Sequence, residues 1–258
     1  GSGKVTTVRL NVIFRQAKES LIIANAHRIN QGEFPLLSKE RDFFFIEESE
    51  PEKIVQMFPE LVKTRIPKYL GCDPVEDIQV LTPMRRTITG VENLNLCLQE
   101  ALNPPGAGKT ELKTGSATFR LGDKVMQLKN DYQKQVFNGD IGRIQHIDPE
   151  DRRLVVAFPE VEGEHRVAYE SEELDQLVLA YVTSVHKSQG NEYPVVIMPV
   201  TTQHFLMLQR NLLYTAVTRA KKLVVLVGTK KAMAIAVKNN KIEERNSLLK
   251  ERLIAAVR

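Results

Sequence analysis

The stretch 182–198 constrains the fold of this chain more than any other. In it, a polar segment that contains Gly190 separates two apolar runs with the length and composition of buried strands. Ligands of open parallel sheets bind at turns of this kind, where a strand ends. A helical pattern over 208–220 and a further apolar run at 223–227 follow. This order predicts a parallel sheet whose loops carry the ligand contacts.

Strand and helix patterns also alternate in the first part of the chain. This alternation is typical of an α/β fold, a parallel sheet with helices on both faces, and Gly32 stands where a left-handed residue would end the first helix. The predicted helices are 17–31, 51–65, 91–102 and 208–220, followed by two basic helices at the end of the chain. The predicted parallel strands are 8–13, 42–46, 77–82, 178–183, 195–199 and 223–227.

The alternation stops at Asn103-Pro104-Pro105-Gly106 and resumes near Leu177. Between these points, short apolar segments are separated by turn signals such as Asn138-Gly139, which predicts a small antiparallel β-barrel inserted into the α/β domain. Its strands are expected at 124–128, 141–147, 154–158 and 165–169. The predicted division is 1–3 as a cloning remnant, 4–105 and 177–258 as the α/β domain, and 106–176 as the inserted barrel.

The formal net charge is +4, and its sign is unevenly distributed along the chain. Acidic residues gather between positions 150 and 175, whereas lysine and arginine dominate 221–252. This asymmetry fits a polyanionic partner, and it fits an ordinary solvated lysine-rich surface equally well.

Composition argues against membrane and metal proteins. No run approaches the roughly 18 apolar residues of a membrane span, and no basic region precedes an apolar leader, so we expect a cytoplasmic protein without a membrane partner. Cys72 and Cys97 have no CxxC or histidine pattern beside them. We therefore expect reduced thiols and no metal site.

The segment Gly106-Ala107-Gly108-Lys109-Thr110 resembles the end of a phosphate loop but does not fit one. The pattern G-x-x-x-x-G-K-[ST] requires glycine where Asn103 stands, and it requires a strand where two prolines stand. No acidic pair closes a strand to hold magnesium either. We expect a flexible loop here, and a chain that does not hydrolyse ATP alone.

Three places carry chemistry that has both a functional and a structural interpretation. Arg219 borders the buried stripe of its helix, where a guanidinium suits a phosphoryl transition state or caps the last carbonyls. The turn His186-Lys187-Ser188-Gln189 offers donors to phosphate or sugar, although a lone histidine is often structural. Phe14 and Arg15 could stack a base and bind phosphate, or be a core ring beside a surface cation.

Five segments, in this order, resemble the C-terminal half of a RecD-like superfamily 1 helicase. They are Ile13-Phe14-Arg15-Gln16, Val80-Leu81-Thr82-Pro83-Met84-Arg85, Val136-Phe137-Asn138-Gly139-Asp140, His186-Lys187-Ser188-Gln189-Gly190, and Tyr214 to Lys221. The resemblance implies a second RecA-like domain with an inserted SH3-like barrel. It also implies an ATP-dependent DNA helicase that moves 5′ to 3′ and works in DNA repair or recombination.

The resemblance further implies roles for individual residues. Arg219 and Arg15 would be catalytic and reach the γ-phosphate. The nucleotide-binding residues would be Phe14, Arg15, Gln16, Gly190, Glu192 and Arg219. The DNA-binding residues would be Thr82, Pro83, Arg85, Asn130, Tyr132, Asn138, His186, Lys187 and Ser188. ATP with Mg²⁺ would be held mainly by an N-terminal RecA-like domain that should precede this chain, so the expected partners are that domain and single-stranded DNA, and a monomer is expected.

Alternatives stay open at this point. In the inserted barrel, Tyr132 and Phe137 could stack bases beside Lys129 and Lys134, or they could be turn and core residues. The whole chain could be a non-catalytic DNA- or partner-binding module, or the helicase portion of a relaxase or exonuclease-complex subunit. A phosphate loop and an acidic pair encoded upstream would favour the motor.

Overall fold

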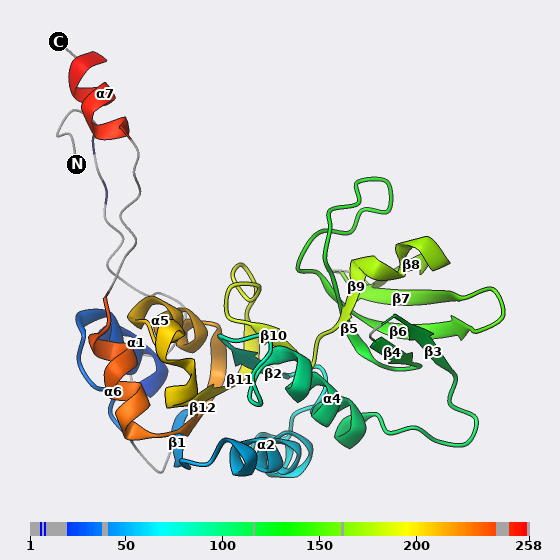
Figure 1. Ribbon diagram of the computed structural model, residues 1–258, viewed down its shortest axis with the longest axis horizontal. Coiled ribbons are helices and arrows are strands. Elements are labelled where there is room, and N and C mark those ends of the chain that lie inside the picture. The colour runs from blue at the N-terminus through cyan, green and yellow to red at the C-terminus, as the bar shows by residue number, and fades with distance from the viewer. Residues whose placement is uncertain are drawn as a thin grey trace.

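The computed structural model describes residues 6, 8, 20–37, 41–115, 117–160, 163–240 and 248–256. Its first sheet is fully parallel, and its described strands lie in the order β1-β12-β11-β2-β10 (Figure 1). They are β1 (Phe43–Glu47), β2 (Ile78–Thr82), β10 (Val182–Ser184), β11 (Tyr193–Val200) and β12 (Ala220–Gly228). The predicted parallel α/β sheet is thus confirmed. The strand expected at 8–13 lies largely outside the described residues.

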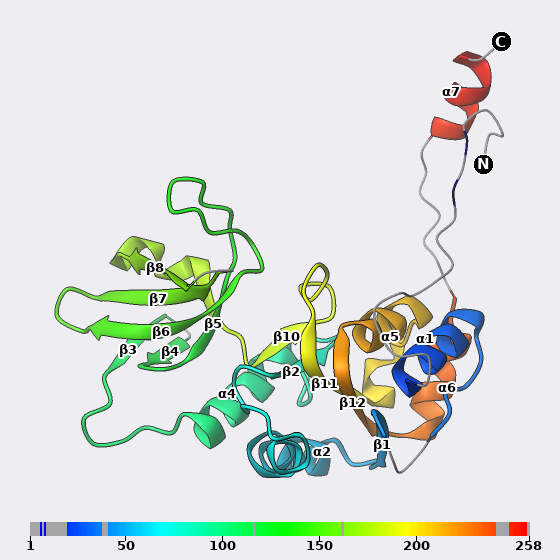
Figure 2. The same cartoon turned by 180° about the vertical axis from the view of Figure 1, so that it is seen from behind.

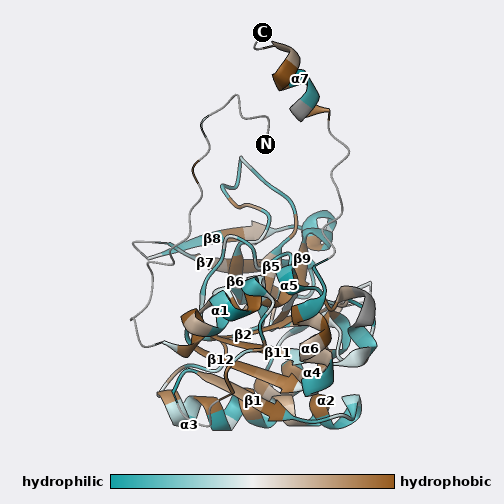
Figure 3. Ribbon diagram, turned by 90° about the vertical axis from the view of Figure 1, so that its left-hand side faces the viewer, coloured by the Kyte–Doolittle hydropathy of each residue, from teal (hydrophilic) through white to brown (hydrophobic). Residues whose placement is uncertain are grey.

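Helices cover both faces of this sheet because its strands alternate buried side chains to either side. On one face, Ile78, Val80 and Val195 join a core with α2 (Pro51–Glu60) and α4 (Val91–Leu102). On the other face, the neighbouring strand residues pack against three further helices. These are α1 (Leu21–Gln31), α5 (Arg210–Thr218) and α6 (Lys230–Lys238). Figure 3 shows β2, β11 and β12 as a hydrophobic layer between the helices.

The remaining helical segments follow local sequence signals. Gly32 ends α1 in the left-handed conformation, with φ +82, as its position predicts. Pro59 lies inside α2 and lacks a backbone donor, and the helix continues beyond it as a π-helical turn, η1, and a short α3. These and the other segments are η1 (Leu61–Arg65), α3 (Ile66–Leu70), η2 (Ser171–Gln176), η3 (Thr202–Met207) and α7 (Leu249–Ala256). No described helix combines the length and apolarity that a membrane crossing requires.

The second sheet is antiparallel, in the order β8-β7-β6-β5-β9, and a separate hairpin, β3-β4, lies beside it (Figure 2). Its strands are β5 (Lys124–Gln127), β6 (Ile141–Asp148), β7 (Arg153–Pro159), β8 (Glu164–Tyr169) and β9 (Leu177–Leu179). The hairpin strands, β3 (Glu111–Thr114) and β4 (Ala117–Arg120), are absent from the sequence prediction. The exact domain boundaries stay a prediction.

The single strand predicted at 178–183 is wrong. The structure divides this stretch into β9, which pairs with Val125 and Met126 of the antiparallel sheet, and β10, which pairs with β2 of the parallel sheet. Ala180 and Tyr181 lie between the two strands and are buried. The run is apolar throughout because both sheets bury it, so its hydropathy gives no sign of the change of partner.

A buried polar joint connects the two sheets, and Asp123 is its centre. Its carboxylate accepts hydrogen bonds from the side chains of Gln99 (2.6 Å), Asn103 (2.6 Å) and Tyr181 (2.9 Å), and from the backbone nitrogen of Arg120 (2.7 Å). Burial raises the pKa of Asp123, and these donors oppose that shift. The donors come from α4, the following linker, β4 and the return into β10, so this one carboxylate links the parallel and antiparallel parts.

Candidate nucleotide and nucleic-acid interface

The segment 185–192 runs from the carboxyl ends of the parallel strands back to their amino ends. It leaves the carboxyl end of β10 and enters the amino end of β11. This return is needed because both strands run parallel to β2, which lies between them. Lys187 N donates to Ser184 Oγ (3.3 Å), Ser188 N donates to the Ser184 carbonyl (3.2 Å), and Gly190 adopts φ +93. This segment is called the crossover. Its first residues lie at the carboxyl ends of the strands, the carboxyl edge, and its last residues lie at their amino ends, the amino edge.

Arg219 lies at the amino edge, between the end of α5 and the start of β12. Its backbone carbonyl accepts from Tyr193 N (2.9 Å), and its Nη1 donates to the carbonyl of Asn191 (3.1 Å). Its Nε is buried and has no partner among the described residues. Among the described residues Arg219 forms no salt bridge, so its guanidinium keeps donors that an anion could use.

Gly190 and Glu192, the other described residues predicted to contact nucleotide, lie on the same crossover. The Glu192 carboxylate forms an ion pair with Lys221 at 3.3 Å and its side chain is 22% exposed. Phe14, Arg15 and Gln16 lie outside the described residues. The structure thus brings Gly190, Glu192 and Arg219 together.

At the carboxyl edge, exposed cations gather where the crossover begins. His186 and Lys187 are exposed, and so is Arg85 in the loop after β2. The pKa of Lys187 is lowered, first by partial desolvation and then by the positive charge of Arg85. Arg85 also forms an ion pair with Glu92 at 2.8 Å. Two cations from different loops therefore face the same region, as a phosphate-binding surface requires.

Three predicted DNA contacts require correction, because their side chains are buried. Thr82 is 0% exposed and its hydroxyl donates to the carbonyl of Thr89 (2.8 Å). Ser188 is also 0% exposed and donates to the carbonyl of Val185 (2.7 Å), and Pro83 is buried as well. These hydroxyls are used to hold the loops, so they cannot face DNA directly.

The loop 129–140 of the antiparallel sheet presents two aromatic rings. Tyr132 is 76% exposed and Phe137 is 43% exposed, and their rings meet edge to face with centroids 5.9 Å apart. Asn130 Oδ1 accepts from the backbone nitrogen of Asn138 (2.9 Å), which holds the loop closed. Phe137 is therefore not a core residue, and the two rings form an exposed pair.

Two lysines near this loop have protein partners. Lys129 pairs with Asp175 at 3.1 Å, and both side chains are exposed. The Lys134 amine bonds Glu173 and the carbonyl of Ala168 (2.8 Å). It also lies 5.1 Å from the centroid of the Tyr169 ring. Lys134 therefore supports the loop and is less available to a ligand than the exposed rings.

His204, at the carboxyl edge of the parallel sheet, is a buried residue that was not predicted from the sequence. It is 1% exposed, and its Nε2 hydrogen-bonds Thr89 Oγ at 2.8 Å. Because Thr89 also accepts from Thr82, these residues fix the loop that carries Arg85. Burial lowers the pKa of His204 to about 4, so its ring is neutral at pH 7. In the sequence, His204 ends the polar run Thr201-Thr202-Gln203, which has no known binding or catalytic spacing.

The buried His204 predicts a loss of stability in mild acid. Its pKa is about 4 in the fold and 6.5 in the unfolded chain, so stability is full above pH 6.5 and falls as the unfolded chain takes up the proton. At about pH 5 the free energy of unfolding should be lower than at pH 7.5 by roughly 2 kcal/mol. Urea unfolding at both pH values measures this difference. His204→Gln should remove most of it, whereas the exposed control His146→Gln should retain it; an equal loss in all three proteins would contradict this role.

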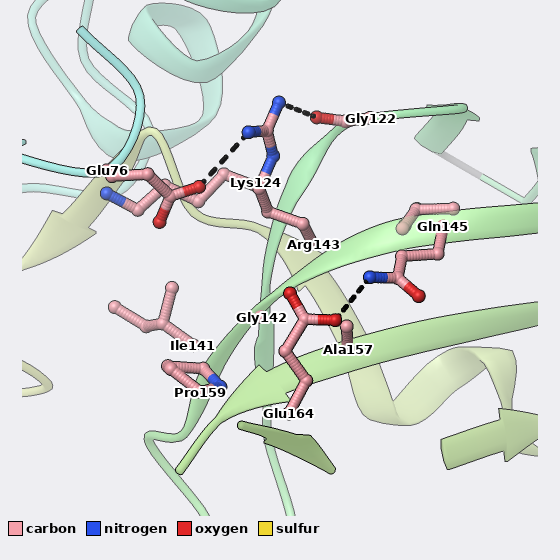
Figure 4. Close-up of a pocket in the computed structure, with 11 residues that line it drawn as sticks. Glu76, Gly122, Lys124, Ile141, Gly142, Arg143, Gln145, Ala157, Pro159 and Glu164 are labelled. Carbon is pink, nitrogen blue, oxygen red and sulfur yellow. Dashed lines mark hydrogen bonds and ion pairs between the residues drawn. The ribbon is translucent and has the colours of Figure 1, made fainter. Parts of the chain in front are cut away.

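One cavity lies apart from these residues, at the junction of the two sheets (Figure 4). Its volume is about 490 Å³, and its polar groups are already engaged. Arg143 pairs with Glu76 at 3.2 Å, and Gln145 donates to Glu164 at 2.7 Å. The fully buried Lys124 donates to the carbonyls of Val75 and Ile78, and burial lowers its pKa to about 8. We therefore assign this cavity to the junction and not to a ligand.

Metal binding finds no support in the described chain. Within the ranges that the structure describes, no group of three or more histidine, cysteine, aspartate or glutamate side chains is placed to hold an ion. Both cysteines are free thiols, and burial raises the pKa of each.

Two protein families match this chain. Residues 94–158 match the SH3 domain of ATP-dependent RecD-like DNA helicases, and residues 179–227 match the UvrD-like helicase C-terminal domain. The first match covers the antiparallel sheet up to β7, and the second covers the crossover, α5 and Arg219. The two matches therefore include the aromatic loop, the crossover and Arg219, but not Arg85.

Individual relatives agree with these matches. The chain is 36% identical to the ATP-dependent RecD2 DNA helicase of Deinococcus radiodurans, over 96% of this chain and 32% of that protein. It is 28% identical to the RecBCD enzyme subunit RecD of Mycobacterium tuberculosis, over 83% of this chain and 37% of the subunit. The chain thus spans about a third of the length of the curated relatives it matches.

A solved structure shares the fold. The crystal structure of a Bacteroides Pif1 helicase, in complex with ADP-AlF3 and single-stranded DNA, matches with a TM-score of 0.50 and 19% identity. The match covers 88% of this chain and 53% of that one. The Pif1 structure shows the fold alone, whereas the family matches identify in this chain the SH3 domain of ATP-dependent RecD-like DNA helicases and a UvrD-like helicase C-terminal domain.

Proposed function

We propose that this chain is the C-terminal motor half of an ATP-dependent DNA helicase, and that it supplies an arginine finger and single-stranded DNA contacts for 5′ to 3′ translocation and unwinding. The observation that carries the proposal is Arg219. Its guanidinium is held at the amino edge of the sheet by Asn191, forms no salt bridge within the described part of the chain, and keeps a buried Nε without a partner there. The named activity of the RecD2 relative supports the same assignment.

The nucleotide itself would be ATP with Mg²⁺, held mainly by another RecA-like domain of the same protein. Lys109 does not replace that domain's phosphate loop, because its amine is already bonded to Asn103 and to the carbonyl of Pro104 (3.1 Å). A planar guanidinium with free donors fits the charge that develops on a phosphoryl group. We call this chain, joined to the domain that carries the phosphate loop, the complete protein.

Within the complete protein, Arg219 would stabilise the transferring phosphoryl group, and Arg15 is proposed to assist it. Glu192 and Gly190 would border the nucleotide from the same crossover. When the cleft closes on ATP, Arg219 is drawn towards the other domain, and hydrolysis releases it. Repeated closure would move the DNA contacts of the two domains relative to each other, which is translocation.

The DNA contacts would come from both sheets. Arg85, His186 and Lys187 would bind phosphates at the carboxyl edge of the parallel sheet. The exposed pair Tyr132 and Phe137 would stack bases, as aromatic residues of single-strand binding proteins do. Asn130 and Asn138 are proposed to shape the backbone of that loop or to contact the strand.

Tyr132→Ala should weaken single-stranded DNA binding by about 5- to 100-fold, because one base loses its stacking partner. Fluorescence anisotropy with a labelled oligothymidine, at several salt concentrations, measures the dissociation constant. The salt dependence should stay unchanged, since no cation is removed. Tyr69→Ala is the matched control, because Tyr69 is 57% exposed on α3, away from the loop, and its loss should leave binding unchanged. Equal affinity of the Tyr132 variant and the wild type would remove this loop from the DNA site.

A further inference from the structure

Asn191 lies between the two proposed sites and bonds to both. Its backbone carbonyl accepts the hydrogen bond from Arg219 Nη1 at 3.1 Å. Its side-chain amide donates to the carbonyl of Gly139 at 3.2 Å, in the loop that presents Tyr132 and Phe137. Each link is one hydrogen bond long, so a single residue connects the guanidinium at the amino edge to the loop of the other sheet.

Both ends of this connection are held by the backbone. Asn191 N donates to the carbonyl of Ser188 (3.1 Å), and the left-handed Gly190 between them fixes the direction of the turn. On the other side, Gly139 N donates to the carbonyl of Gln127 (2.9 Å), which ends β5. A displacement of Asn191 is therefore passed to the loop instead of being absorbed by slack in either segment.

We propose that Asn191 is a positioning residue that couples the state of Arg219 to the aromatic loop 129–140. The proposal rests on the function proposed above, because it gives Arg219 and the loop their ligands. When Arg219 moves onto the phosphates, its Nη1 draws the Asn191 carbonyl, and the Asn191 amide draws Gly139. Nucleotide binding thus changes how Tyr132 and Phe137 meet the strand, and by linkage DNA on the loop favours the engaged position of Arg219.

Only one of the two contacts of Asn191 depends on its side chain. The contact to Arg219 uses the backbone carbonyl, which every substitution keeps. The contact to Gly139 uses the side-chain amide, which alanine removes and glutamine retains on an arm one methylene longer. Asn191→Ala therefore cuts the connection to the loop while leaving the acceptor for Arg219, and Asn191→Gln serves as the conservative variant.

The test measures ATP turnover by the complete protein, with and without saturating oligothymidine. The ratio of the two rates, the DNA stimulation, should fall by about fivefold in Asn191→Ala, which corresponds to a coupling near 1 kcal/mol. Asn191→Gln should recover part of the stimulation. Gln145→Ala, which removes an amide that donates to Glu164 in the antiparallel sheet, is the control and should keep it.

Two results would overturn the coupling. One is a stimulation ratio within twofold of the wild type in Asn191→Ala, and the other is an equal loss of turnover with and without DNA, which would mean that Asn191 only supports Arg219. Thermal melting of each variant separates misfolding from either result. Failure of the proposed function is recognised separately, because it would show as normal turnover in Arg219→Ala or normal DNA binding in Tyr132→Ala.

Discussion

Arg219→Ala in the complete protein should lower ATP turnover by about 10³-fold or more, the effect that arginine fingers have on phosphoryl transfer. The guanidinium donates through Nη1 to the Asn191 carbonyl, and the Arg219 backbone carbonyl accepts from Tyr193 N. Alanine therefore removes the charge and the bond to Asn191 but keeps the backbone bond that positions the segment. DNA affinity should stay within a few-fold, because the cations and rings proposed to bind DNA lie elsewhere. Steady-state turnover and anisotropy binding measure the two quantities.

Two further variants sharpen this prediction. Arg219→Lys keeps the positive charge but not the planar fork of donors, so it should recover only a small part of the turnover. Lys222→Ala removes an exposed cation from the start of β12 and should have little effect. Turnover near the wild-type rate in Arg219→Ala would refute the catalytic role. A matching loss in Lys222→Ala would point to a general electrostatic effect.

Asp123→Ala should lower the free energy of unfolding by about 3–5 kcal/mol, because it leaves several buried donors without an acceptor. The side chains of Gln99, Asn103 and Tyr181 all donate to this carboxylate, and alanine offers them no acceptor. Urea unfolding followed by circular dichroism measures the difference. Since the joint links the two sheets, the variant should also unfold in a less cooperative transition.

The control for this prediction is Asp175, an exposed aspartate that pairs with a lysine. Asp175 is 67% exposed and pairs with Lys129, which is 60% exposed, so Asp175→Ala should cost below about 1 kcal/mol. Asp123→Asn keeps the shape and one acceptor and should lie between the two. If Asp123→Ala is no more destabilising than Asp175→Ala, the joint does not hold the sheets together.

The fold and the candidate site were predictable from the sequence to different degrees. The polar crossover between two apolar strands, and Arg219 beside the buried stripe of a helix, follow from local hydropathy and were placed correctly in the chain. The change of sheet between β9 and β10 was not, because an apolar run has the same appearance in either sheet. The hairpin β3-β4 was missed because its strands are short and only partly apolar.

The sequence also did not show which polar side chains are available to a ligand. Thr82 and Ser188 carry hydroxyls that suit a DNA contact, but both are buried and donate to nearby carbonyls, those of Thr89 and Val185. Lys109 has the spacing of a phosphate-loop lysine only in part, and in the fold its amine is bonded to Asn103. His204 follows a polar run with no recognisable motif, yet it fixes the loop that carries Arg85 through Thr89.

The sequence by itself determined the parallel α/β sheet, the antiparallel insertion and the segment where the candidate ligand contacts are concentrated. Those properties depend on residues a few positions apart, and the periods of strand and helix express them directly. Only the tertiary structure decided which polar groups stay available, that Asn191 reaches both Arg219 and Gly139, and that Asp123 joins the sheets. These depend on residues far apart in the chain that meet only after folding, and no local pattern records such meetings.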